Sequence, residues 1–140
     1  MACNLVQFAG APLQALGSHT APRSPAAVID GCNVARGISP RRPQFRLIKT
    51  AFLALERQGF QVVVVVSHAL VARVDQQAVL FRWENGGRIV IAPHREDDDL
   101  SVLRLAHQGR GTVLSNDHFR DYARLAAGLP REAFASLAKN

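Results

Sequence analysis

Apolar and polar positions change along this chain in blocks that have the lengths and spacings of strands and helices. Four short apolar runs predict buried strands: residues 26–30, 60–66, 88–93 and 112–115. Between them, apolar residues recur at helical spacing over residues 45–59, 75–86 and 97–109. Strands that alternate with helices predict an α/β domain with a mainly parallel sheet of four to five strands, flanked by helices.

Polar and small residues mark the ends of these elements. Gly31 reads as a turn after the first strand, whereas Asp75 and Asp97 are placed to cap the helices that follow them. A last helical stretch is predicted after His118. The large aromatic residues of the helices fit core packing better than base stacking: Phe45, Phe52 and Trp83.

The 140 residues fit one domain, which we place at residues 26–140. Residues 1–25 are rich in glycine and proline and contain one basic residue and no acid, which predicts a flexible N-terminal leader; a transit peptide is a weaker alternative. No apolar run approaches the roughly 20 residues that span a bilayer. The two cysteines fit a reducing compartment, so a cytoplasmic protein without membrane contact is expected.

The charge of the chain points to a polyanionic partner. There are 17 basic and 11 acidic side chains, and fifteen of the basic ones are arginine. Arginine is well suited to bidentate phosphate contacts, so RNA or another nucleic acid is a plausible ligand. Charge by itself indicates affinity and no reaction.

Against this basic background, acids gather where the predicted strands end. Six of the 11 acids follow the first, third and fourth strands: Asp30, Asp97, Asp98, Asp99, Asp117 and Asp121. Ligands of parallel α/β sheets bind beyond the carboxyl ends of the strands, so these acids are expected at one edge. Each acid alone could equally cap a helix, end a strand or face solvent. Their convergence from three segments favours a shared role.

Carboxylates crowded at one edge need a compensating charge. Two of them about 4 Å apart repel by roughly 4 kcal/mol at an effective dielectric near 20. Mg²⁺, or alternatively Mn²⁺, prefers such oxygen ligands, and it can activate water and neutralise charge that develops on a phosphodiester. An acidic centre with basic surroundings is the charge layout of a metal-dependent nuclease.

Three motifs resemble the NYN branch of the PIN-like ribonucleases, and the Regnase type in particular. They are VIDGCNVARG (residues 28–37), DDLSVLRLA (98–106) and GTVLSNDHFRD (111–121), and DQQAVLFRWENGGRIVIAP (75–93) is similar to the helix and strand before the acidic pair of the family. The resemblance implies a Rossmann-like PIN fold and a Mg²⁺-dependent endoribonuclease.

The resemblance also implies roles for individual residues. Catalytic acids would be Asp30, Asp98, Asp99, Asp117 and Asp121, and the metal ligands among them Asp30, Asp99, Asp117 and Asp121, with Asp99 favoured over Asp98. Asn33 would orient Asp30 or a water, and Ser115 and Asn116 would shape the metal-binding turn. Apart from the resemblance, the basic group that follows Asp30 would bind RNA phosphates or else form a solvated helix face, two interpretations of equal weight: Arg36, Arg41, Arg42, Arg46 and Lys49.

The chain departs from the family pattern in three ways. The loop between Pro93 and Asp98 is short, no CCCH zinc finger is present, and the chain ends before the usual final strand of the family. An RNA-binding or interaction module with weak or absent catalysis therefore stands as the alternative function. A phosphohydrolase of the aspartyl-phosphate type is disfavoured, because Cys32 stands where that class has its second aspartate. A homodimer is left open.

Overall fold

Four parallel strands and one antiparallel edge strand form a single sheet. The structure is a computed structural model that describes residues 4–7, 24–109 and 111–116. Its strands are β1 (Asn4–Gln7), β2 (Ala26–Asp30), β3 (Gln61–Val66), β4 (Ile89–Ile91) and β5 (Thr112–Ser115), in the spatial order β1-β5-β2-β3-β4. Strands β2 to β5 are mutually parallel, and β1 pairs antiparallel with β5. The predicted sheet and its four parallel strands are confirmed.

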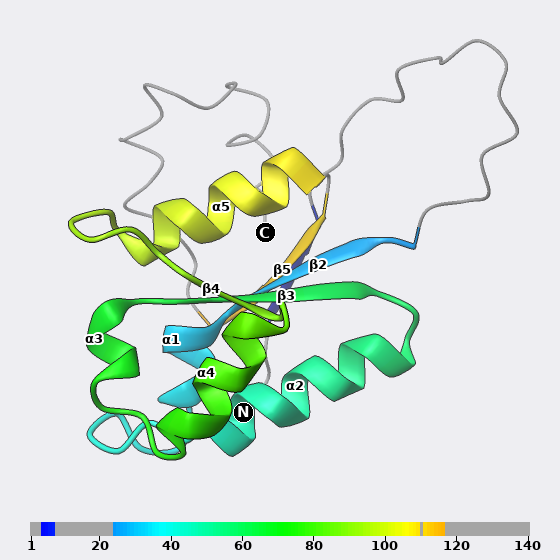
Figure 1. The fold of residues 1–140 in the computed structure, drawn as a ribbon. Helices are drawn as coiled ribbons and strands as arrows, with labels where there is room; N and C mark the ends of the chain where they lie inside the picture. Colours follow the sequence, from blue (N-terminus) through cyan, green and yellow to red (C-terminus); the bar gives the residue numbers. More distant parts are fainter. Residues whose placement is uncertain (1–3, 8–23, 110, 117–140) are drawn as a thin grey trace, which may run out of the picture.

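Helices cover both faces of this sheet. They are α1 (Gly31–Ala35), α2 (Phe45–Arg57), α3 (His68–Val71), α4 (Gln77–Asn85) and α5 (Asp98–Gly109). Helix α5 lies on one face, and α2 and α4 lie on the other (Figure 1). Because consecutive side chains of a strand point to opposite faces, Ile29 packs in the core under α2, whereas Val28 packs in the core under α5.

The parallel arrangement decides where the functional residues meet. β2, β3 and β4 run side by side in one direction and end next to α1, α3 and the loop before α5 (Figure 1). β5 runs the same way beside β2 and ends at Ser115. Side chains that follow these strands therefore lie together where the parallel strands end, which we call the carboxyl edge of the sheet, as the sequence predicts.

Three features of the fold were not predicted. Residues 4–7 of the expected leader form β1, a four-residue edge strand that pairs with β5, and a run this short is hard to identify from a sequence pattern. The short helices α1 and α3 begin directly at, or one residue after, the ends of β2 and β3. Gly31 is thus the first residue of a helix and not a turn residue. The helical stretch predicted after His118 lies outside the described residues.

Phe45, Phe52 and Trp83 pack in the core, as expected. The Trp83 ring meets Phe45 and Phe52 edge-on, with centroids 5.2 Å and 4.8 Å apart. The Arg88 guanidinium lies 5.3 Å from the Trp83 ring centroid. None of the helices within the described residues is long and apolar enough to span a membrane.

Asp75 caps a different helix from the predicted one. The residue before α4, Gln76, makes no side-chain cap, and its φ of 56° places it in the left-handed region. The Asp75 carboxylate instead accepts a hydrogen bond from the backbone N–H of Phe45 at 2.6 Å, at the start of α2. Gln44, which precedes α2, offers no side-chain cap of its own. A residue thirty positions away therefore satisfies this helix end.

We expect Asp75→Ala to lower the free energy of unfolding by about 1 kcal/mol, the usual cost of a lost N-terminal cap. Asp75→Asn keeps an oxygen acceptor at this position and should lose less. Urea denaturation of both variants beside the wild-type chain measures the difference. Equal stability of Asp75→Ala and the wild-type chain would contradict the capping role.

Candidate functional site

Asp30 forms the buried base of the site. It ends β2 and starts α1, and its side chain is 1% exposed. One carboxylate oxygen accepts from the Asn33 backbone N–H at 3.1 Å, so Asp30 is the N-cap of α1. The other accepts from the Ser115 hydroxyl at 2.7 Å, which links β2 to the end of β5. These two bonds hold the Asp30 carboxylate in one orientation at the carboxyl edge of the sheet.

Asp98, the first residue of α5, lies close to Asp30. One ligand atom from each of Asp30, Cys32 and Asp98 lies within 4.8 Å of the other two. A second such group consists of Asp97, Asp98 and Asp99, so Asp98 is common to both. The structure thus brings Asp30 together with the first acid of α5, whereas the resemblance pointed to Asp99 as the metal ligand.

Cys32 lies between these acids as a neutral thiol. Burial raises the pKa of the Cys32 thiol to about 12, and a hydrogen bond to Asp98 adds to the rise. The sulfur also lies 3.2 Å from the Ser67 hydroxyl oxygen, and the Ser67 backbone N–H donates to it at the same distance. These two contacts lower the pKa, but burial has the larger effect, so the thiol is protonated and is no nucleophile at neutral pH.

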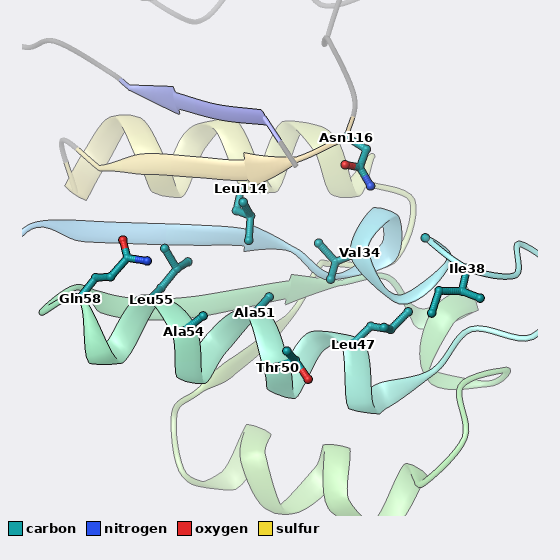
Figure 2. Close-up of a pocket in the computed structure, with 11 residues that line it drawn as sticks. Val34, Ile38, Leu47, Thr50, Ala51, Ala54, Leu55, Gln58, Leu114 and Asn116 are labelled. Carbon is teal, nitrogen blue, oxygen red and sulfur yellow. The ribbon is translucent and has the colours of Figure 1, made fainter. Parts of the chain in front are cut away.

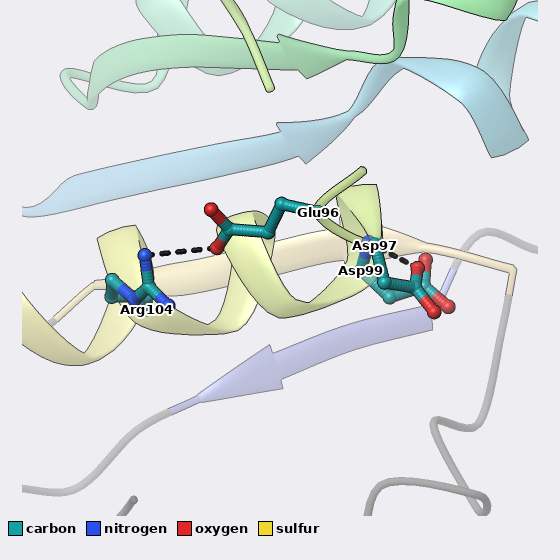
Figure 3. Close-up of polar contacts among 4 residues, drawn as sticks. All are labelled: Glu96, Asp97, Asp99 and Arg104. Carbon is teal, nitrogen blue, oxygen red and sulfur yellow. Dashed lines mark hydrogen bonds and ion pairs between the residues drawn. The ribbon is translucent and has the colours of Figure 1, made fainter. Parts of the chain in front are cut away.

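The four acids around the start of α5, Glu96 to Asp99, have different roles. Glu96 is removed from the cluster, because its carboxylate pairs with Arg104 of α5 at 2.8 Å. Asp97 accepts from the Asp99 backbone N–H at 3.2 Å and so caps α5, as predicted. Figure 3 shows Glu96 directed along the helix to Arg104, away from Asp97 and Asp99 at the helix start. Asp98, the acid between those two, is the one that reaches Asp30.

Asn33 and Asn116 connect α1 to the end of β5. The Asn33 side-chain oxygen accepts from the Asn116 backbone N–H at 2.8 Å. It is therefore the backbone of Asn33 that holds Asp30, while the side chain fixes the segment after β5. Ser115 is fully buried, so its hydroxyl positions Asp30 from within the core.

The remaining predicted residues divide into those at the surface and those outside the described part. Arg36 follows α1 and is partly exposed, whereas Arg41 and Arg42 are exposed in the loop before α2. That loop is on the side of the sheet from which α1 emerges (Figure 1). Asp117 and Asp121 lie outside the described residues, so their roles stay predictions.

An apolar groove of about 410 Å³ runs beside α2 and is separate from the acids. Val34, Leu47, Ala51, Leu55 and Leu114 are among its lining residues (Figure 2). Its lining contains no titratable side chain, so it lacks the groups that phosphodiester chemistry needs. Asn116 is the point where the groove approaches the carboxyl edge (Figure 2).

Sequence reasoning overlooked the part that Cys32 and Ser67 play in the site. From the sequence, neither residue is assigned a role in the proposed metal site. The available signal for Ser67 was its place as the first polar residue after β3, at the edge where ligands of such sheets bind. For Cys32 the signal was its position two residues after Asp30, within the first turn of α1.

The donor set fits a hard divalent cation. The nearby oxygens of Asp30 and Asp98 would repel by roughly 3 kcal/mol at an effective dielectric near 20 if both were ionised. Mg²⁺ and Mn²⁺ prefer carboxylate and water oxygens, whereas a protonated thiol adds little to their binding. The two carboxylates are therefore the groups that would hold such an ion.

Comparisons with known proteins identify the family and the fold of this chain. The family model of the Zc3h12a-like ribonuclease NYN domain matches residues 24–131. The solved structure of Arabidopsis thaliana nuclear protein-only RNase P 2 is similar over 81% of this chain and 26% of its own, with a TM-score of 0.60 and 16% identity. At that identity the likeness shows the fold. A comparison with curated protein sequences finds no match.

Proposed function

Because this chain belongs to the family of Zc3h12a-like ribonuclease NYN domains, we propose that it is a metal-dependent endoribonuclease. The observation that carries the proposal is the meeting of Asp30 and Asp98, which come from the end of β2 and the start of α5. Asp99 is close enough to Asp98 to share in the same centre, and Asp117 and Asp121 complete the proposed set.

Mg²⁺, with Mn²⁺ as a substitute, is the cofactor that suits these oxygens. When bound, such an ion supplies charge neutralisation at the scissile phosphate and lowers the pKa of water. Asp30 would hold it from a fixed position, because Ser115 and the Asn33 backbone N–H already orient the Asp30 carboxylate. Asp98 would hold it from the first turn of α5.

The arginines beside α1 would hold the RNA backbone over this centre. Arg36 is partly exposed, and Arg41 and Arg42 are exposed in the turn that starts at Ser39. Guanidinium groups bind phosphate bidentately and would fix the position of the strand without reading its sequence. The acids and arginines together provide the charge layout that cleavage inside an RNA strand requires.

Cleavage of a labelled single-stranded RNA in Mg²⁺, in Mn²⁺ and in EDTA tests the proposal. We expect internal cuts with either ion and none in EDTA, with 5′-phosphate ends, because water attacks the phosphorus in this chemistry. Ends of this kind also separate the activity from contaminating ribonucleases that use the 2′-hydroxyl. RNA binding in EDTA without cutting under any condition would instead indicate an RNA-binding module that lacks catalysis.

A further inference from the structure

Two histidine rings stack on one another at the surface of the carboxyl edge. The His68 and His94 ring centroids are 3.8 Å apart, and the ring planes differ by 9°. Both residues are nevertheless exposed. Aromatic pairs inside this protein behave differently, since Phe45 and Phe52 meet Trp83 edge-on in the core. The histidine pair is thus an open, flat, polar aromatic surface.

This histidine pair lies next to the acidic centre. His68 directly follows Ser67, which exchanges hydrogen bonds with Cys32 beside Asp30 and Asp98. His94 belongs to the short loop between β4 and α5 and precedes Asp98 by four residues. In Figure 1, α3 and the start of α5 lie at the same end of the sheet. A nucleic acid strand that reaches Asp98 would therefore pass close to both rings.

The loop that carries His94 adopts a strained backbone conformation. A hydrogen bond from the Glu96 N–H to the Pro93 carbonyl at 3.1 Å closes a turn over His94 and Arg95. Arg95 takes a φ of 69°, a region that favours glycine. The Arg95 side chain is exposed, so its own burial does not offset the strain. Backbone strain of this kind is found most often at ligand sites. Here it occurs in the residue directly after His94, whose ring is stacked on that of His68.

We propose that His68 and His94 form the stacking site for an unpaired nucleobase next to the scissile phosphate, and that Arg95 binds the adjoining phosphate. The inference rests on the proposed ribonuclease function and adds to it a subsite on the β3–β4 side of the acids. Flat side chains stack on every base, and RNA-binding proteins use histidine in this way. A base inside a duplex is already stacked on its neighbours, so the subsite selects single-stranded RNA.

The test measures binding in EDTA, where metal-dependent cutting does not occur. The probe is a single-stranded oligoribonucleotide that contains 2-aminopurine, whose fluorescence falls when the base stacks. We expect quenching by the wild-type chain. His94→Ala and His68→Ala should each weaken binding about 5- to 20-fold, the lower part of the range for one base–aromatic stack, and should abolish the quenching. His94→Phe keeps a flat ring and should restore both signals.

Arg95→Gly tests the phosphate contact without disturbing the turn. Glycine accepts the positive φ at no steric cost, so a weaker complex would report the lost cation and not a distorted loop. The slope of log Kd against log salt should become shallower by about 0.7, the value for one phosphate contact on a single strand. His107→Ala in α5, away from the edge, is the matched control and should bind as the wild-type chain does.

Failure of this inference can be told from failure of the proposed function. If the chain cuts RNA but His94→Ala keeps the wild-type Kd and quenching, the stacking subsite is overturned while the ribonuclease stands. If the wild-type chain quenches the probe, the histidine variants do not, and no cutting occurs in Mg²⁺, the subsite stands without catalysis. No binding of the single-stranded probe by the wild-type chain would also overturn the subsite.

Discussion

Replacing Asp98 with asparagine is expected to lower kcat for RNA cleavage at least about 100-fold while the fold is retained. Loss of a group that merely orients a metal ligand costs about 10- to 100-fold, so loss of a ligand should cost more. Asparagine keeps the size of the side chain and removes the negative charge that faces Asp30. Asp98 is only partly buried, so the substitution should leave thermal unfolding close to that of the wild-type chain.

Asp97→Asn provides the matched control for Asp98→Asn. Asp97 is the neighbouring acid, but it is exposed and accepts a hydrogen bond from the Asp99 N–H as the cap of α5. Asparagine is an equally good cap, so cleavage by Asp97→Asn should stay within about threefold of wild type. Initial rates in saturating Mg²⁺ compare the two variants. Comparable rates for Asp98→Asn and Asp97→Asn would show that the centre is built from other acids.

Asp99→Asn distinguishes two arrangements of the centre. If Asp99 and Asp98 bind the same ion, Asp99→Asn should lower the cleavage rate about as much as Asp98→Asn does. If the ion is held between Asp30 and Asp98 alone, Asp99→Asn should cut at rates near those of Asp97→Asn. The same initial-rate measurements decide between the two.

A methyl group added at position 31 is expected to destabilise the protein by about 3 kcal/mol. A Cβ atom at Gly31 would lie 2.7 Å from a Val66 side-chain carbon, 2.8 Å from one of Val64 and 2.8 Å from the Val65 carbonyl oxygen. All three belong to β3, against which the first turn of α1 packs. Because one of these atoms is backbone, the neighbours cannot yield by changing a rotamer.

Gly31→Ala should therefore show a lower midpoint in urea denaturation and a loss of cleavage, since a shifted α1 moves the backbone N–H that binds Asp30. Gly86→Ala is the control. A Cβ at Gly86 would meet the nearest carbonyl oxygen at 3.4 Å, and its backbone φ is −80°. The stability of Gly86→Ala should stay within about 0.5 kcal/mol of wild type. A Gly31→Ala protein as stable as the Gly86→Ala protein would contradict the close packing of α1 on β3.

Local patterns in the sequence were sufficient for the four parallel strands, for helices α2, α4 and α5, and for the end of the sheet at which Asp30 and Asp98 meet. The β-branched run before Ser67 predicted a strand buried on both faces, and the stripe from Phe45 to Leu55 predicted α2. Both signals are periodicities that burial imposes on neighbouring residues, so they are readable without a structure. The parallel order of the strands then brings Asp30 and Asp98 to one edge, because polar residues that follow parallel strands emerge on the same side.

The sequence could not show which groups of distant segments touch. Asp75 was predicted to cap α4 but caps α2, since the choice depends on how the loop before α4 docks against residue 43. Residues 4–7 form an edge strand because they pair with residues 112–115, more than 100 positions away in the chain. In both cases the deciding contact joins residues that are far apart in the chain, and local periodicity contains no information about it.

The same distinction applies to the site. The sequence alone predicted an acidic cluster surrounded by basic residues, and its motifs showed the resemblance to NYN ribonucleases. Both depend only on which residues are present and in which order. Only the tertiary structure decided that Asp98 lies close to Asp30, that Ser115 orients Asp30 from within the core, and that the Cys32 thiol lies close to both acids. The physical reason is that successive residues of a helix point in different directions. Where α5 begins, and how it packs on the sheet, therefore decide which of its acids points at β2.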